Sequence, residues 1–545
     1  MNLPKSLINN DKVTLFPEGA LGYLVGPTLA MLANSILAGY FNRYMSDVLH
    51  VNNWASTFFT WLPVISVAFV VLGNILVGRL MDHLKSNAGK ARPLILLSVP
   101  ISLIALVILF VISPFATDTI NTEQQTMALV CIAIGYNLWF ALAYPVYSTP
   151  HAALVSLSTR DTKDRSLLAT ISNATALAAM GLTNMILPFF LGSLFVYDMS
   201  GNGTAVLNDA GAIDHYVDAG GNILYDARTS YEHWKVFVIA LIIITLVGAV
   251  IEYFFTRERV TEEGAGEDGQ AKAALPIGAQ AKICFSDKFW IIMIAFFFFY
   301  QLGGMLKNVS QTYFCLAMFA PYTVESGGQI QGLISIIGAI PTAIGMVIAW
   351  PLSNKIGKGK AILCGAVVST LGGILGLLFP TNVTMVIVSF VIKALGSTPA
   401  MYLSLALLAD VLDHQEALHG ARTDGFSMTI YGAIMAGMTG IATGLLNAIL
   451  AGLNYDISTV ASNTALRAAM PWLFIGGETV GYALIFVIFL FMGVEKFSDL
   501  DHLAIQMDQG VTPDKDAKPL QVDEKTLEEF NAMRKANGRA EVKIG

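Results

Sequence analysis

Long uninterrupted apolar segments are the feature of this sequence that most limits its fold. A helix of about 20 apolar residues crosses a hydrocarbon core about 30 Å thick, and the chain contains twelve segments of this kind. Only 13% of the residues are charged, against about 25% in soluble domains. The sequence therefore predicts an all-α membrane protein with twelve transmembrane helices, and it excludes a soluble protein. The predicted spans are 19–40, 54–78, 93–114, 127–150, 167–194, 235–255, 289–310, 329–352, 361–379, 385–407, 425–450 and 472–494.

The positive charges predict the orientation of these spans, because cytoplasmic loops carry an excess of Lys and Arg. With the N-terminus inside, the loops between spans hold sixteen Lys and Arg residues on the cytoplasmic side and four on the outer side. We therefore expect a multi-pass protein of the cytoplasmic membrane with both termini in the cytoplasm. The first span is long and lacks a small-residue cleavage site, so it is expected to be an uncleaved helix.

The polar segments divide the chain into two halves of six spans. Residues 1–255 form the N-terminal half, which includes a long outer loop at 197–233 with turn signals typical of a small hairpin. Residues 256–288 are rich in Glu, Gly and Ala, and they are expected to form a flexible cytoplasmic linker. Residues 289–494 form the C-terminal half, and 495–545 form a solvated cytoplasmic tail with one short helix.

Composition and motifs exclude several classes of function. A net charge of −7 without a basic tract disfavours a nucleic-acid partner, since such partners require a basic face. The sequence shows no metal-ligand spacing, catalytic nucleophile motif or phosphate-binding loop, so we expect neither an enzyme nor an ATP-driven pump. The expected partners are a small-molecule substrate and the lipid bilayer, with no cofactor, no metal and no obligatory protein partner. A coupling ion would be Na⁺ or H⁺.

Three polar motifs lie at the predicted cytoplasmic ends of spans. They read GRLMDHLKSNAGKARP between spans 2 and 3, YPVYSTPHAALVSLSTRDTKDRSLL from span 4 into the next loop, and LLADVLDHQEALHGARTDG between spans 10 and 11. These motifs resemble those of the glycoside-pentoside-hexuronide:cation symporters, relatives of melibiose permease, over about residues 15–495. The resemblance implies the major facilitator fold, with two six-helix bundles that move a sugar, glycoside or hexuronide by alternating access.

Charged residues of these motifs are candidates for a cytoplasmic gate. Asp410, Asp413 and Glu416 follow one another at intervals of three residues, so they share one helix face. Ion pairs between the two halves could hold one access state and break in the other. The gate candidates are Asp82, Arg92, Asp161, Arg165, Asp410, Asp413, Glu416 and Arg422.

The sequence departs from the family at the positions that the resemblance assigns to the coupling cation. The family has Asp residues on spans 2 and 4, where this chain has Val70, Asn74 and Ser148. The implied sugar-contacting positions are also altered, to Leu24, Asn173 and Ala436. Glu478 is the one deep acid found by sequence, so the coupling candidates are Asn74, Ser148 and Glu478.

Lys307 and Lys393 are the two lysines inside apolar segments. A lone charge at mid-membrane costs at least about 2.5–3.5 kcal/mol. Lys393 therefore either pairs with Glu478, which lies at a similar depth, or faces the substrate, unless a helix boundary is misplaced. Amides, hydroxyls and aromatic faces suit a sugar, although the same groups also bond helix to helix. The substrate-site candidates are Asn34, Asn137, Trp139, Tyr144, Ser148, Asn173, Gln301, Lys307, Asn308, Lys393 and Tyr431.

Two alternatives to a cation-coupled sugar transporter remain. The altered site and the two lysines would also suit a uniporter or a carrier of another anionic or amphiphilic metabolite. A membrane sensor is the alternative from another class, although it would need a signalling domain. His151, at the end of span 4, is interpreted as either a helix-end cap or a pH sensor.

Overall fold

The computed structural model describes residues 3–10, 12–84, 86–117, 120–159, 162–208, 211–259, 276–421, 423–508 and 523–542. Within these residues each of the twelve predicted spans is helical over most of its length, and the all-α membrane fold is confirmed. In the part of the chain that the structure describes, ten helical segments are long and apolar enough to cross a membrane. The other two predicted spans lie in α7 (Thr162–Leu194) and α11 (Val324–Ile356). The chain divides into two compact units.

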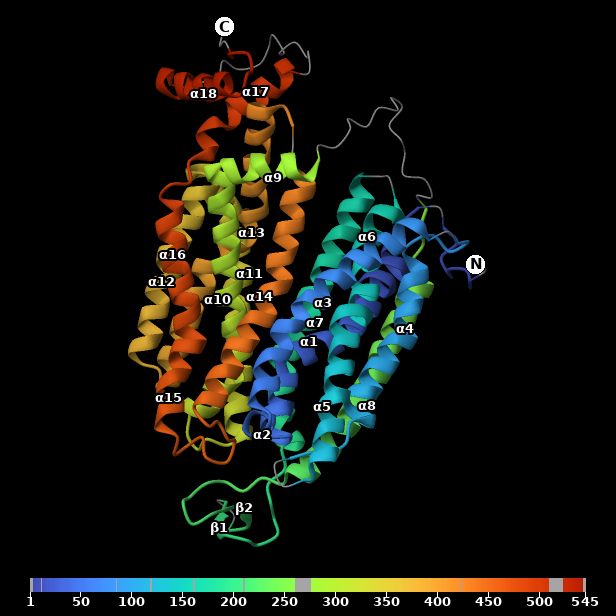
Figure 1. Ribbon diagram of the computed structural model, residues 1–545, viewed down its shortest axis with the longest axis vertical. Helices are drawn as coiled ribbons and strands as arrows, with labels where there is room; N and C mark the ends of the chain where they lie inside the picture. The colour runs from blue at the N-terminus through green and yellow to red at the C-terminus, as the bar shows by residue number, and fades with distance from the viewer. Residues whose placement is uncertain are drawn as a thin grey trace. The chain divides into compact units, whose positions relative to one another are not determined.

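The first unit comprises Met1–Glu267, Met305–Ile336 and Thr439–Phe474. Figure 1 shows the N-terminus at one end of its helices and the β1–β2 hairpin beyond the other end. We refer to these as the predicted cytoplasmic end and the predicted outer end. Its elements are α1 (Gly26–Arg43), α2 (Val51–Trp54), α3 (Ser56–His83), α4 (Arg92–Leu106), α5 (Thr122–Asn137), α6 (Tyr144–Ser158), α7, β1 (Thr204–Leu207), β2 (Ile213–Val217), α8 (Ala227–Phe255) and α15 (Thr464–Pro471), with π-helical turns at Leu15–Val25, Tyr44–Val48, Val107–Ile112, Leu138–Ala143 and Trp472–Gly476.

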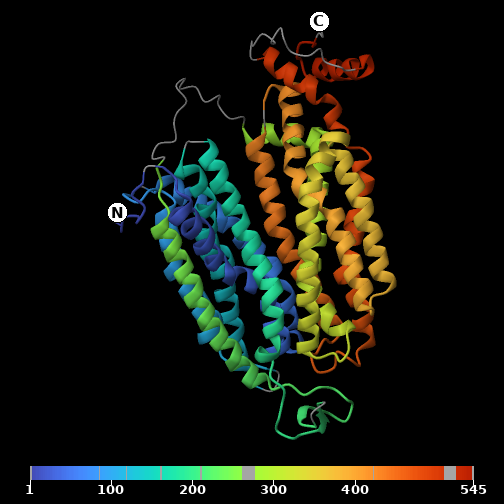
Figure 2. The same ribbon diagram turned by 180° about the vertical axis from the view of Figure 1, so that it is seen from behind.

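The second unit comprises Asp268–Gly304, Ile337–Met438 and Ile475–Gly545. Figures 1 and 2 both show α17 and α18 lying across one end of α13. The helices α10, α11 and α14 and the π-helical turn Trp472–Gly476 contribute residues to both units. The elements are α9 (Ile277–Ser286), α10 (Lys288–Met318), α11, α12 (Lys358–Leu378), α13 (Val383–His419), α14 (Asp424–Gly452), α16 (Gly477–Phe489), α17 (Ser498–Asp508) and α18 (Glu524–Ala536), with a 3₁₀ turn at Val494–Phe497.

Two of the polar segments differ from their sequence interpretation. The end of the segment expected to be a flexible linker forms α9, because its Cys284 is fully buried beside the hydroxyl of Thr423. The tail is not simply solvated, because Phe530 and Arg534 of α18 are also fully buried. Their spacing of four residues puts them on one helix face, and Arg534 donates to the carbonyl of Ala417 on α13. The predicted outer hairpin and tail helix are both present.

The two units contain the same helix-capping arrangement. In the first unit, the carboxylate of Glu258 accepts three backbone N–H groups at the start of α4, at 2.8–3.0 Å. In the second, Glu495 accepts two at the start of α12, at 2.6 and 2.8 Å. Gly89 and Gly357 precede these helices with φ of 100° and 88°, and a side chain at either position would collide with the capping carboxylate. The two halves of the chain thus share this arrangement, as expected of a transporter fold built from internal repeats.

We expect Glu258→Ala and Glu495→Ala each to lower the free energy of unfolding by about 0.5–2 kcal/mol, the usual cost of losing a helix cap. Thermal unfolding of the purified variants in detergent measures the effect. The exposed Glu528 provides the matched control, since Glu528→Ala removes a carboxylate that caps no helix. Unchanged melting temperatures for both capping variants would contradict this role.

Candidate functional site

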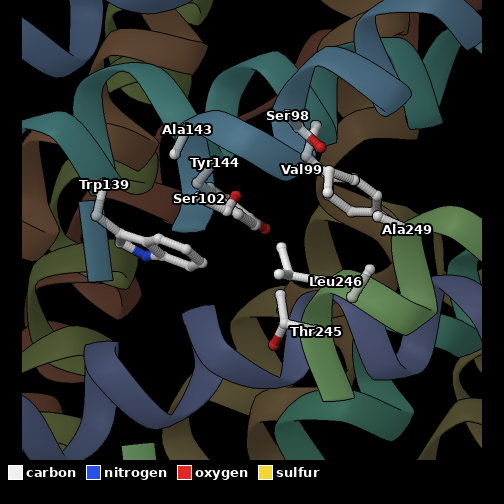
Figure 3. A pocket seen from close by; sticks show the side chains of 11 residues that line it. Ser98, Val99, Ser102, Trp139, Ala143, Tyr144, Thr245, Leu246 and Ala249 are labelled. Carbon is white, nitrogen blue, oxygen red and sulfur yellow. The ribbon is translucent and has the colours of Figure 1, made fainter. Parts of the chain in front are cut away.

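A small cavity inside the first unit brings together two predicted substrate residues. Trp139 and Tyr144 line it, and Figure 3 shows them across from Thr245 and Leu246 of α8. Within the described residues, Nε1 of Trp139 and Oγ1 of Thr245 are buried without a hydrogen-bond partner. The volume of about 10 Å³ has room for about one water molecule. In this conformation the cavity is too small for a sugar ring, and Trp139 faces the interior of its helix bundle.

A buried carboxylate lies beside this cavity. Tyr147, which also lines the cavity, donates its hydroxyl hydrogen to Oε2 of Glu252 on α8. The other oxygen, Oε1, lies 2.7 Å from Nδ1 of His151, and Nε2 of His151 lies 3.0 Å from the hydroxyl of Ser172. Glu252 is 0% exposed and His151 is 4% exposed. Side chains of α6, α7 and α8 thus form one continuous set, Tyr147, His151, Ser172 and Glu252, which we call the Glu252 network.

The N-terminal segment, residues 3–10, binds the C-terminal end of α8, and Glu252 lies in the last turn of that helix. The backbone N–H of Leu7 and the hydroxyl of Ser6 both donate to the carbonyl of Phe254, at 2.9 and 3.1 Å. Carbonyls at a helix C-terminus have no partner within the helix. The segment supplies such partners, and it covers this end of α8.

Lys393 and Glu478 form an ion pair in the second unit, which was one of the alternatives left open by the sequence. The Nζ of Lys393 lies 2.7 Å from Oε2 of Glu478 and 3.4 Å from the carbonyl oxygen of Ile475. The two residues are only 4% and 5% exposed. The pair joins α13 to α16, and each charge neutralises the other.

Two gate candidates bind neighbouring helices of their own unit. Both carboxylate oxygens of Asp410 accept from Nζ of Lys358, at 2.7 and 2.6 Å. Arg92 donates to the carbonyl of Tyr253 at 2.7 Å, at the C-terminal end of α8, where the helix dipole is negative. These contacts hold α12 to α13 and α4 to α8.

A cluster of buried polar side chains lies at the predicted outer end of the first unit. Arg43 and Asp47 form an ion pair one helical turn apart, and they are 1% and 2% exposed. The hydroxyl of Tyr313 on α10 accepts from Nδ2 of Asn42 at 2.9 Å and lies 2.9 Å from Oγ of Ser46. These five residues, which we call the outer cluster, connect the end of α1 to α10.

The other predicted residues are spread over the two units. Asn34 is partly buried, and its amide oxygen has no partner within the described residues. Asn74 is exposed and donates to a carbonyl of its own helix. Gln301 donates to a carbonyl of α14, and Tyr431 of α14 packs on Phe297 with ring centroids 4.8 Å apart. Asn137, Ser148, Lys307, Asn308, Asp413 and Glu416 are partly buried. Asp161 and Arg422, and the side chains of Asp82, Arg165 and Asn173, lie outside the described residues.

Sequence reasoning missed the Glu252 network and the outer cluster. Glu18, Asp47 and Glu252 are buried within the protein as well as Glu478, although they lie near helix ends. Asp47 was assigned to a loop because the predicted span ended at residue 40, whereas the helix continues through π-helical turns to Val48. A spacing of four residues, as between Arg43 and Asp47, is a local signal that could have revealed the outer pair.

Apolar helices with polar residues buried among them are typical of a multi-pass membrane protein, and the comparisons identify the class. The fold resembles that of a D-xylose-proton symporter, with a TM-score of 0.55 at 12% identity, covering 87% of this chain and 97% of that structure. It also resembles nucleoside transporter NupG, with a TM-score of 0.53 at 12% identity, covering 87% and 99%. These likenesses show the major facilitator fold.

Residues 22–496 match the family described as MFS/sugar transport protein. The chain therefore belongs to this family. One relative, an uncharacterized symporter YnaJ of Bacillus subtilis (strain 168), is 23% identical over 78% of this chain and 80% of its own length. Another, a glucuronide carrier protein homolog of Escherichia coli (strain K12), is 22% identical over 75% and 78% of the two lengths.

Proposed function

We propose that this chain carries a sugar, glycoside or hexuronide across the cytoplasmic membrane by alternating access, coupled to a cation. The family match over residues 22–496 carries the proposal, because it reaches from the first span to the end of the last. Relatives named as a glucuronide carrier homolog and a putative glycoside/cation symporter support this substrate class. We place both termini in the cytoplasm, because the positive charges favour that side.

The polar groups on otherwise apolar helices support a sugar as the substrate more than they support an anion. Asn34 presents an amide in the first unit, and Gln301 and Tyr431 present an amide and a hydroxyl in the second. The charge of Lys393, which could have selected an anion, is neutralised by Glu478. We therefore favour a substrate recognised through hydroxyl groups over a carrier of an unrelated anionic metabolite. We assign the Lys393–Glu478 pair to holding α13 against α16.

Uptake into membrane vesicles tests the function. Vesicles with and without the protein are offered labelled methyl glycosides, pentoses and hexuronides, under imposed Na⁺ or H⁺ gradients and without a gradient. We expect protein-dependent accumulation of at least one sugar, driven by one of the two ions. Accumulation only of non-sugar anions would overturn the substrate class, and uptake that no gradient increases would indicate a uniporter.

Asn34 gives a specific test of sugar recognition. Replacing Asn34 with Leu removes the amide, and a net loss of about 0.5–1.5 kcal/mol per hydrogen bond predicts a KM about 2- to 12-fold higher. The matched control is Asn447→Leu, because Nδ2 of Asn447 donates to the carbonyl of Phe59 at 2.6 Å in a fully buried position. The control should lower the amount of folded protein rather than raise KM. An unchanged KM for Asn34→Leu would remove Asn34 from the site.

A further inference from the structure

We propose that the Glu252 network binds the proton that drives transport, so that the coupling ion is H⁺ and its site lies within the first unit. This inference rests on the proposed function for its role in transport, but the proton site itself can be measured without a substrate. It is carried by three observations: a carboxylate and an imidazole in contact, their burial, and a hydrogen-bond partner that serves both states of the imidazole.

The hydrogen bonds let His151 gain or lose a proton without leaving a polar atom unpaired. In the neutral ring, Nδ1–H donates to Glu252, and Nε2 accepts the O–H of Ser172. When a proton adds to Nε2, the new N–H donates to Oγ of the same Ser172, whose hydroxyl hydrogen turns away. Only a hydroxyl can both donate and accept at one position. Both protonation states therefore keep the same contacts.

The change in charge favours proton binding in this environment. With a neutral imidazole, the network carries the full negative charge of the Glu252 carboxylate in a fully buried position, which is costly. One proton on His151 converts the site to a neutral ion pair with a short contact of 2.7 Å.

The charged groups around the network largely cancel one another. On the π-helical turns before α1, Glu18 binds the guanidinium of Arg259 through two contacts of 2.8 Å. On α4, Arg92 binds the end of α8, and the backbone N–H groups beside it bind Glu258. Within the described residues, the other ionisable groups near the network are phenols, among them Tyr23, Tyr147 and Tyr253. At the far end of α8, Arg43 and Asp47 form their own pair. The net charge of the Glu252 network therefore depends mainly on whether its side chains carry the added proton.

Tyr147 connects the proton site to the cavity. It lines the cavity, while its hydroxyl binds Glu252. Ala249, one turn before Glu252 on α8, lines the same cavity. A change of charge at Glu252 is therefore transmitted directly to the helices α6 and α8 that enclose Trp139 and Tyr144, which is the contact that coupling requires.

A proton titration of the purified protein without substrate tests the site. We expect the wild type to bind about one more proton per molecule than Glu252→Gln between about pH 8 and 5. The reason is that His151 loses its carboxylate partner in the variant and stays neutral. The matched control, Glu258→Gln, changes a carboxylate at the same end of the unit that binds only backbone N–H groups, and it should titrate like the wild type. Equal proton binding by wild type and Glu252→Gln would overturn the proposal.

Substitutions of Ser172 give a second test. The measurement is the rate of vesicle uptake as a function of pH, with a sugar that the uptake experiment has identified as a substrate. Ser172→Ala removes the acceptor for the added N–H, so the pH midpoint should fall by about one unit, a tenfold loss in proton affinity. Ser172→Thr keeps the hydroxyl and should keep the wild-type midpoint. Identical midpoints for the alanine variant and the wild type would contradict the hydrogen-bond argument.

The two proposals fail in different ways. If no sugar is taken up while the titration still finds the Glu252-dependent proton, the proposed function fails and the proton site stands. If a sugar is accumulated and Glu252→Gln accumulates it under a pH gradient as the wild type does, the proton site is wrong and the transport function stands.

Discussion

Replacing Asp47 with Asn is expected to make Cys315 react with a membrane-impermeant maleimide at least about ten times faster from the outer side. Cys315 is 0% exposed and lies two residues from Tyr313 of the outer cluster. Breaking a buried ion pair leaves an uncompensated charge and costs about 3–5 kcal/mol. In a protein that alternates between access states, part of this cost shifts the equilibrium toward the state in which the outer cluster is open.

The measurement uses a background in which Cys131, Cys284 and Cys364 are replaced by Ser, so that Cys315 is the remaining thiol. The matched control is Asp456→Asn, because the contact of Asp456 with His50 is longer, at 3.6 Å, and partly exposed. The control should label at the background rate. Labelling of the Asp47 variant at that same rate would show that the outer cluster does not hold the outer end closed.

The second large effect is expected from Lys393→Ala. This change leaves the buried carboxylate of Glu478 without its charged partner, at a cost of about 3–5 kcal/mol. We expect little folded protein in the membrane and no uptake. Fluorescence-detected size-exclusion chromatography and vesicle uptake measure the two quantities.

A double variant, Lys393→Met with Glu478→Leu, separates structure from function. Replacing both partners of a buried pair by apolar residues of similar volume is often neutral or stabilising, so the amount of folded protein should recover. Because we assign the pair to holding α13 against α16, uptake should recover as well. Recovery of folding without uptake would instead return Lys393 to the substrate site.

The helices could be predicted from sequence, but several of their ends could not. Every predicted span is helical because its apolar length has no alternative in a bilayer. The predicted end of span 10 at residue 407 is too early, since α13 continues to His419. The extension is charged, so hydropathy cannot detect it. It is stable because Phe530 and Arg534, more than one hundred residues later, pack on it.

Contacts in the candidate site could be predicted only between residues that are close in the sequence or that lie at the same depth in the membrane. Counting residues from the outer ends of two spans placed Lys393 near Glu478, and the two do form a pair. The Glu252 network is different, because His151 and Glu252 are 101 residues apart. No periodicity links such positions, and the end of α8 is also bound by an N-terminal segment about 250 residues away in the sequence.

The N-terminal segment also has a consequence for biosynthesis. Its partners at the end of α8 are about 250 residues further along the chain. At roughly 5–20 residues per second, the ribosome takes some tens of seconds to reach them. Residues 3–10 therefore remain without these native contacts until the sixth span has been made. A peptide fused before this segment would be present throughout this interval. It would compete with the binding of residues 3–10 to the C-terminal end of α8.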